Sequence, residues 1–303
     1  MLDLLVLGAA AGGGFPQWNS NAPGCQRARA GDPNAPARTQ ASLAVSGDGE
    51  HWFILNASPD LRAQINQTPA LHPKDGLRST PISGVVLTSG EIDAITGLLT
   101  MRERQAYGLY ATASVLAQLD ANPIFDALDR TLVPRQTMVL DEPLSLMPGN
   151  LRVTPFSVPG KVPLYAERGE NPAEIMNNGE TIGLDITDGQ HRALFIPGCA
   201  MMTDALRDRL NGADVVFFDG TLWTDDEMVR AGLGAKTGRR MGHMSIADEP
   251  DGTIAAFRPL NVARKVLIHI NNSNPILLAD TPERRQVEEA GWDVAYDGMR
   301  ITL

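Results

Sequence analysis

Two carboxylates that could do chemistry, Glu91 and Asp93, follow a short apolar run and precede a helix-like segment. Residues 84–87 have the composition of a buried strand, with turn-forming residues on both sides. Open α/β sheets bind their ligands at the carboxyl ends of such strands, where carboxylates can hold a metal or move a proton. Acidic residues in a first helical turn also serve as partners of the helix dipole. The local pattern alone leaves both interpretations open.

Three more candidates lie elsewhere in the chain. Asp219 ends the apolar run 215–218, His269 ends the run 266–268, and His243 lies between a glycine and Met244. Each residue alone is also explained as a turn or core residue. Because strand ends on one side of a sandwich converge, the recurrence favours a shared site. Imidazoles and carboxylates together suit zinc, iron or manganese.

The elements that must position these residues alternate between strand-like and helix-like segments. Ranges 215–221 and 266–272 are expected to be buried strands, and the end of the chain, 294–303, a hairpin. Other expected strands cover 2–7, 42–45, 52–56, 84–87, 109–111, 138–140, 151–156, 181–187 and 193–197. Residues 19–38 are expected to form a loop, and 112–129 and 205–210 helices. This order predicts an α/β (α+β) fold, an αββα sandwich of two mixed sheets flanked by helices, in one domain covering residues 1–303.

A glycine-rich turn, Gly12 to Gly14, follows the first expected strand. It lacks the G-x-G-x-x-G spacing of a dinucleotide site, and Pro16 interrupts the helix that would receive a pyrophosphate. Three consecutive glycines instead predict that the backbone closely approaches another strand or a ligand.

Composition limits the classes of function. The 303 residues are 43% hydrophobic and 20% charged, with a formal net charge of −10. Nonspecific nucleic-acid binding and binding to anionic membranes need a basic surface, so neither is expected. No apolar run approaches the length of a transmembrane helix, and the first residues lack the basic segment of a signal peptide. Two cysteines are too few for a disulfide framework. We expect a cytoplasmic protein.

Six segments, in order along nearly the whole chain, resemble the family of pyrroloquinoline quinone (PQQ) biosynthesis protein B. They are 12–19 (GGGFPQWN), 56–62 (NASPDLR), 97–103 (GLLTMRE), 218–221 (FDGT), 242–245 (GHMS) and 268–275 (IHINNSNP). This resemblance implies the metallo-β-lactamase superfold, in agreement with the sandwich expected above.

The resemblance also assigns roles. The superfold's motif H-x-H-x-D-H aligns with residues 89–94, where Asp93 matches but Ser89, Glu91 and Ala94 replace the histidines. Lost imidazoles argue against a dinuclear zinc hydrolase. His269 matches the superfold's final histidine. We therefore expect a mononuclear metal site. Its expected ligands are Glu91, Asp93, Asp219 and His269, and the catalytic residues are His243, as a proton-transfer group, and Asp93.

Many relatives carry three cysteines in the N-terminal loop, in a pattern that resembles a structural zinc site. Here the corresponding residues are Ser20, Ala22 and Cys25. One thiolate cannot complete a tetrahedral site, so no structural zinc is expected and Cys25 should be a small buried side chain. A structural role is likewise favoured for Cys199.

The resemblance implies an iron-dependent hydroxylase acting on a Glu-Tyr-derived precursor of PQQ, with Fe(II) or another divalent metal as cofactor. Arg102 is a candidate for binding the acidic substrate. One alternative is a non-catalytic carrier that takes PQQ or its precursor toward the periplasm, and a weaker one is a divergent metal-dependent hydrolase. The expected partner is thus a small molecule, without nucleic acid or membrane insertion, and a homodimer stays open.

Overall fold

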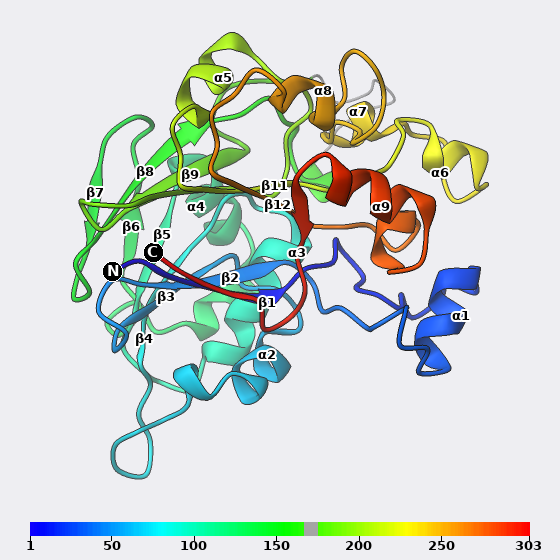
Figure 1. Cartoon of the computed structure of the whole chain (residues 1–303). Helices are drawn as coiled ribbons and strands as arrows, with labels where there is room; N and C mark the ends of the chain where they lie inside the picture. The colour runs from blue at the N-terminus through cyan, green and yellow to red at the C-terminus, as the bar shows by residue number, and fades with distance from the viewer. Residues whose placement is uncertain (167–174) are drawn as a thin grey trace.

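Two packed β-sheets form the centre of the protein (Figure 1), which is a computed structural model describing residues 1–166 and 175–303. One sheet has the order β14 (Arg300–Thr302), β1 (Asp3–Gly8), β2 (Ser42–Ser46), β3 (Trp52–Leu55), β4 (Ile82–Val86), β5 (Gly108–Ala111) and β6 (Arg135–Thr137). The other has the order β13 (Trp292–Val294), β12 (Arg264–Ile268), β11 (Val215–Asp219), β10 (Arg192–Ile196), β9 (Ile182–Thr187), β8 (Leu151–Ser157) and β7 (Leu144–Leu146). The αββα prediction is confirmed.

Each sheet is mixed, and its parallel part carries the expected site residues. Strands β3 to β6 pair in parallel, and so do β10 to β13. Asp219 at the end of β11 is in register with Ile268 at the end of β12. The next residue, His269, therefore emerges beside Asp219 at the carboxyl edge of the sheet.

Alternating side chains build the layers. Phe217 belongs to the core between the sheets, whereas its neighbour Phe218 packs under the helices of the second sheet. The first sheet is covered by α2 (Leu61–Gln67), α3 (Ile92–Ile95) and α4 (Ala113–Asp120), and the second by α5 (Asp204–Leu210), α8 (Thr253–Phe257) and α9 (Pro282–Glu289). The apolar layers are thus three: one between the sheets and one between each sheet and its helices. Burial of each large side chain contributes about 1.5–3 kcal/mol to the free energy of unfolding, so these layers hold the strand ends in place.

The expected C-terminal hairpin is wrong. β13 lies in the second sheet and β14 pairs with β1 in the first, so the chain crosses between sheets after Val294. Asp297 holds this crossing, since its carboxylate accepts hydrogen bonds from the backbone N–H of Ala9 (3.2 Å) and from the N–H and Oγ1 of Thr39 (both 2.7 Å). Long-range contacts therefore override the local hairpin pattern.

Three other expectations need correction. The expected loop 19–38 contains a helix, α1 (Pro23–Arg29), which begins with a proline at its first position. The expected helix 112–129 ends with α4 at Asp120, and a separate 3₁₀ turn, Pro123–Ala127, follows. Residues 138–140 lie beyond β6, where the chain turns at Asp141 (φ 61°) toward β7.

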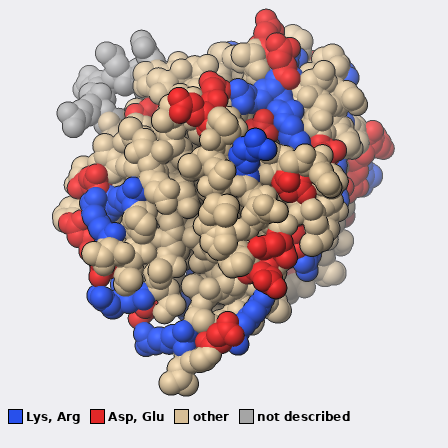
Figure 2. Space-filling model, turned by 90° about the vertical axis from the view of Figure 1, so that its left-hand side faces the viewer, with Lys and Arg blue, Asp and Glu red and all other residues tan. Residues whose placement is uncertain are grey.

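Charged side chains of both signs lie on the surface of the protein. On the face shown in Figure 2, acidic and basic side chains are interspersed, and several basic side chains adjoin one another near the upper right of the view. Among the residues described, no helix is both long enough and apolar enough to cross a membrane.

Candidate metal centre

A short turn after β11 forms the base of the site. The buried carboxylate of Asp219 accepts hydrogen bonds from the Thr221 N–H (3.0 Å) and the Thr221 hydroxyl (2.6 Å) through Oδ1. Its other oxygen, Oδ2, accepts the backbone N–H of Cys199 at 2.9 Å. Such an Asp-x-Thr turn is a local device of strand ends, and here it fixes the carboxylate rigidly.

His269 follows β12 in a left-handed conformation (φ 58°), which is uncommon for a residue with a side chain. The Thr221 hydroxyl lies 2.9 Å from His269 Nδ1 and 3.0 Å from the His269 carbonyl. The glycine-rich loop lies next to this segment, because Ala11 donates its N–H to the carbonyl of Ile270, the residue after His269 (2.8 Å). These contacts hold the backbone that aims the His269 ring.

His243 arrives from the other side of Asp219. The helix α7 (Gly238–Met241) ends at Gly242, whose φ of 93° turns the chain. His243 Nδ1 lies 2.8 Å from Asp219 Oδ2 and 3.0 Å from the Thr221 hydroxyl. Its ring stacks on that of His269, with centroids 5.1 Å apart and planes 18° apart. The Nδ1 atoms of both rings therefore face the same hydroxyl.

Asp93 lies on α3, the helix that follows β4 of the first sheet, and its Oδ2 lies 2.9 Å from His269 Nε2. Burial alone would raise the pKa of Asp93, but the hydrogen bond and charge of His269 outweigh it and lower that pKa. Burial likewise opposes the charged form of His269, yet Asp93 and then Asp219 raise the pKa of this histidine. The loop covers the pair, since a Cβ added at Gly12 would lie 3.3 Å from Asp93 Oδ2. Gly12 thus approaches a side chain of α3, whereas the sequence predicts an approach to another strand or to a ligand.

The hydrogen-bond pattern tests whether these residues fit a metal. Thr221 has a single hydroxyl proton, and its shortest contact is to Asp219, so it can accept Nδ1–H from both histidines. This arrangement assigns an Nδ1–H to each ring and directs Nε2 of His269 at Asp93 Oδ2, 2.9 Å away; supporting groups orient histidine ligands in this way. His269 Nε2 and Asp93 Oδ2 lie at hydrogen-bond distance, and a proton shared by two such groups is released when a cation binds them. The donor set fits one divalent metal.

Asp219, His243 and His269 offer ligand atoms within 4.8 Å of one another. Both oxygens of Asp219 already accept hydrogen bonds, two of them from backbone N–H groups. That saturation suits an orienting carboxylate better than a ligand, whereas Asp93 has an oxygen directed at His269 Nε2. Asp93 is not one of these three grouped residues of the described chain, but its contact with His269 Nε2 places it next to them.

Two other predicted site residues lie apart from this group. Glu91 has its Oε1 3.1 Å from the ammonium of Lys161, and it is not among the grouped ligand atoms of the described residues. Arg102 follows the 3₁₀ helix Thr96–Met101, where its side chain is 56% exposed and donates to the carbonyl of Leu99. The structure records no contact between Arg102 and the cluster among the residues described.

Both cysteines are buried and free. Cys25 is buried, and its Sγ lies 3.8 Å from Asn272 Oδ1. Arg29 donates to the carbonyls of Ser20 (2.6 Å) and Gln17 (2.5 Å), so a guanidinium ties this loop together. Burial and the charge of Asp219 raise the pKa of the Cys199 thiol, which disfavours the nucleophilic thiolate.

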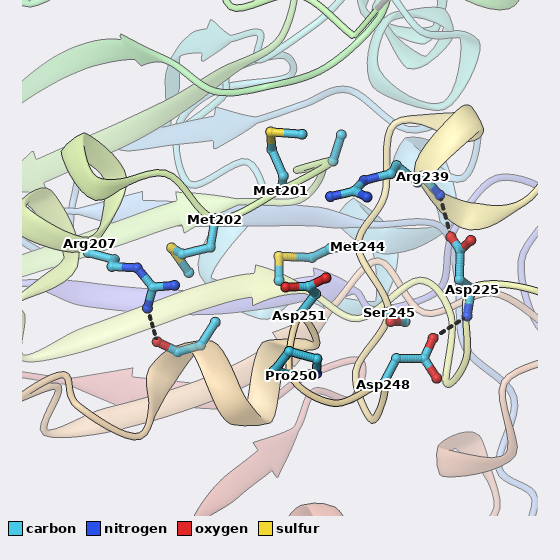
Figure 3. Close-up of a pocket in the computed structure, with 12 residues that line it drawn as sticks. Met201, Met202, Arg207, Asp225, Arg239, Met244, Ser245, Asp248, Pro250 and Asp251 are labelled. Carbon is cyan, nitrogen blue, oxygen red and sulfur yellow. Dashed lines mark hydrogen bonds between the residues drawn. The ribbon is translucent and has the colours of Figure 1, made fainter.

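A cavity of about 230 Å³ lies next to the group of Asp219, His243 and His269, on the side of α5 and α8 (Figure 3). Met244 and Ala200, which line it, directly follow His243 and Cys199 in the sequence. Thioethers, guanidinium groups and carboxylates all face it, from Met201, Met202, Met244, Arg207, Arg239, Asp225, Asp248 and Asp251. Sequence interpretation missed this cavity and also Thr221, although the Asp-x-Thr pattern was a usable signal for the latter.

Comparisons with known proteins agree with this architecture. The profile of the beta-lactamase superfamily domain matches residues 51–270. Coenzyme PQQ synthesis protein B of Gluconacetobacter diazotrophicus is 70% identical over 307 residues, covering 100% of both chains. The crystal structure of Zn²⁺-bound PqqB from Methylobacterium extorquens is 48% identical, covers 99% of this chain and 100% of its own, and has a TM-score of 0.96. A diphosphatase of the PhnP family (TM-score 0.66, 19% identity, covering 100% and 98%) shares the fold.

Proposed function

Because the chain belongs to the coenzyme PQQ synthesis protein B family, within the beta-lactamase superfamily, and takes part in PQQ synthesis, we propose that it is a metal-dependent hydroxylase. Its substrate is the Glu-Tyr-derived precursor of PQQ. The observation that carries the proposal is the group of Asp219, His243 and His269, whose ligand atoms lie within 4.8 Å of one another, together with the contact of Asp93 Oδ2 with His269 Nε2 at 2.9 Å. Two imidazoles and one carboxylate are the ligand set of many non-haem iron oxygenases.

The metal in this proposal is iron(II), held by the Nε2 atoms of His243 and His269 and by the carboxylate of Asp93. The relative from Methylobacterium extorquens is Zn²⁺-bound, which supports binding of a divalent metal in this family. Bound iron(II) supplies the one-electron and O₂ chemistry that protein side chains lack. The few protein ligands leave positions for oxygen and substrate.

The protein's own groups position and protect this centre. The Thr221 hydroxyl contacts Nδ1 of both histidines, and Asp219 contacts Nδ1 of His243. Contacts of this kind fix the tautomer and orientation of a histidine and strengthen its binding to a metal. The proton shared by Asp93 and His269 leaves when a metal arrives. The glycine loop packs against the Asp93 carboxylate on one side of the site.

The reaction balances with an external reductant. One oxygen atom of O₂ enters a C–H bond of the tyrosine ring, and the other leaves as water with two electrons and two protons from the reductant. The test is anaerobic loading with iron(II), followed by ¹⁸O₂, ascorbate and a tyrosine-containing precursor. Product that is heavier by one ¹⁸O atom supports the proposal. Asp93→Ala and His269→Ala should lower turnover at least about 100-fold, whereas the surface control His72→Ala should not.

A carrier is the second candidate, favoured by Ser89 and Ala94 at positions where the superfold's motif has histidines. A carrier needs to bind PQQ or its precursor but not to change it. Tight binding without turnover in the iron-loaded protein, unaffected by Asp93→Ala and His269→Ala, would favour the carrier and contradict the hydroxylase.

A further inference from the structure

The cavity of about 230 Å³ beside His243 carries charged groups that the proposed hydroxylation does not use. The segments that follow β10 and α7, and the segment that leads into α8, form much of its wall. The first two are joined, because the N–H of Met244 donates to the Cys199 carbonyl (2.7 Å). The third is joined to the second, because Thr253 donates its N–H (2.9 Å) and its hydroxyl (3.2 Å) to the Ser245 carbonyl. Hydrogen bonds thus form the cavity in advance, as in most small-molecule sites.

Two opposite charges line this cavity without pairing with each other. The backbone N–H of Arg239 donates to the Asp225 carboxylate (2.7 Å), but the Arg239 guanidinium has no hydrogen bond or ion pair among the residues that the structure describes. The Asp251 carboxylate likewise has no recorded partner within the described part of the chain. A ligand that carries both a negative and a positive group satisfies both side chains at once.

A buried hydroxyl and a second guanidinium add to this pair. Ser245 lines the cavity and is 7% exposed, and its hydroxyl has no hydrogen bond recorded in residues 1–166 and 175–303. A buried polar group without a partner is costly, so a ligand that supplies a partner gains affinity. Arg207 donates to the Ala256 carbonyl (2.9 Å), and its Nε lies 3.9 Å from the exposed Asp204. Its guanidinium extends into the cavity from the side opposite to Arg239 (Figure 3).

The remaining lining and the volume define the rest of the ligand. Met201, Met202 and Met244 present thioethers to the cavity (Figure 3), and methionine packs adaptably against apolar and aromatic groups. The carboxylates of Asp225 and Asp248 each accept a backbone N–H at 2.7 Å, so backbone groups already compensate part of their charge. Drug-sized ligands need about 300–1,000 Å³. A cavity of about 230 Å³ therefore suits a smaller molecule.

We propose that this cavity binds a free α-amino acid with an apolar or aromatic side chain. The ligand carboxylate binds the guanidinium of Arg239 and accepts the hydroxyl of Ser245. The ligand ammonium binds the carboxylate of Asp251, and its side chain lies along the methionines. This inference goes beyond the proposed function, because neither the metal nor O₂ takes part in the binding.

Isothermal titration calorimetry of the full metal-loaded chain with L-phenylalanine tests the proposal. Two analogues probe the charges, since 2-phenylethylamine lacks the carboxylate and 3-phenylpropionate lacks the ammonium. Each should bind at least about tenfold more weakly than L-phenylalanine, because each leaves one charged group of the cavity without its partner. Affinity for L-phenylalanine should be unchanged after a chelator removes the metal. Binding that requires the metal would overturn the proposal, because the ligand would then lie at the metal centre.

Substitutions assign the binding to the cavity. Arg239→Gln and Asp251→Asn should each weaken binding of L-phenylalanine about tenfold or more, and Arg239→Lys should recover part of the loss. Arg239→Gln should leave the weak binding of 2-phenylethylamine unchanged, because that analogue has no carboxylate. Arg240→Gln is the matched control, since Arg240 lies on the same helix but does not line the cavity. Thermal melting of each variant shows whether the fold is intact.

Three outcomes overturn the proposal. They are the absence of binding to wild type, equal binding of L-phenylalanine and both analogues, and equal losses in Arg239→Gln and Arg240→Gln. All three leave the ¹⁸O result, and hence the proposed hydroxylase, unaffected. Loss of ¹⁸O incorporation with Arg239-dependent binding preserved contradicts the hydroxylase alone and supports the amino-acid site.

Discussion

Replacing Thr221 by valine removes one hydroxyl from the centre of the proposed metal site and keeps the side-chain shape. Thr221 is 5% exposed, so no bulk water replaces the lost group. The hydroxyl contacts Asp219 Oδ1 (2.6 Å), His243 Nδ1 (3.0 Å) and His269 Nδ1 (2.9 Å). A single substitution therefore acts on both histidines and their supporting carboxylate.

The size of the effect follows from the partners that remain. Asp219 keeps the N–H groups of Cys199 and residue 221 and the contact with His243 Nδ1. For His269 Nδ1, the Thr221 hydroxyl is the partner recorded among the described residues. A buried group left without its hydrogen bond costs about 1–3 kcal/mol. Because Asp219 stays bonded, we expect the free energy of unfolding of the metal-free protein to fall by about 1–2 kcal/mol.

The larger effect should be on the metal. Loss of a group that orients a histidine ligand typically weakens metal binding about 10–100-fold. Anaerobic titration of the apo-protein with iron(II) or zinc measures this affinity, and denaturant unfolding measures the stability. Thr221→Ser keeps the hydroxyl and should bind metal within about threefold of wild type. If Thr221→Val binds metal as tightly as wild type, the histidines are not oriented through this hydroxyl and the reasoning fails.

Three further predictions concern pH, packing and the N-terminal loop. In the metal-free protein, the raised pKa of His269 stabilises the fold below about pH 6.5 and the lowered pKa of Asp93 stabilises it above about pH 3.9. The free energy of unfolding should therefore fall as pH rises through the folded-state pKa of the histidine, and His269→Gln should remove this dependence; an unchanged pH profile would refute the ion pair. Gly97→Ala would place a Cβ against the carbonyl oxygen of Ser58, so it should lower the free energy of unfolding by about 1–3 kcal/mol. Because Gly97 follows α3, which carries Asp93, the substitution should also weaken metal binding, as measured by titration. Wild-type stability would show that the backbone shifts to accommodate the methyl group. Cys25→Ser should keep the metal stoichiometry of wild type in elemental analysis, and loss of one zinc per chain would reveal a structural site in the loop.

Much of the fold could be predicted because strong local patterns coincide with it. The apolar runs before Asp219 and His269 are strands, and parallel register brings their carboxyl ends together. Expected strand positions therefore sufficed to group these two residues. The expected Asp93 contact also exists, because the two sheets face each other across one apolar core.

Other features depend on contacts that local patterns do not encode. His243 reaches Asp219 only because Gly242 adopts a left-handed conformation after a four-residue helix. The Glu91–Lys161 pair joins residues 70 positions apart, so no local motif indicates it. The sequence around Asp297 has the pattern of a hairpin, and the crossing between the sheets depends on the hydrogen bonds that its carboxylate accepts from Ala9 and Thr39.

The most direct test of the central claim is the metal stoichiometry of protein loaded with iron(II) under anaerobic conditions and freed of excess metal. Wild type should retain one iron per chain, and the variants Asp93→Ala, His243→Ala and His269→Ala should each retain far less, whereas Glu91→Gln should stay near one. Two metal ions per chain, or full retention by the three variants, would contradict a mononuclear centre held by these residues.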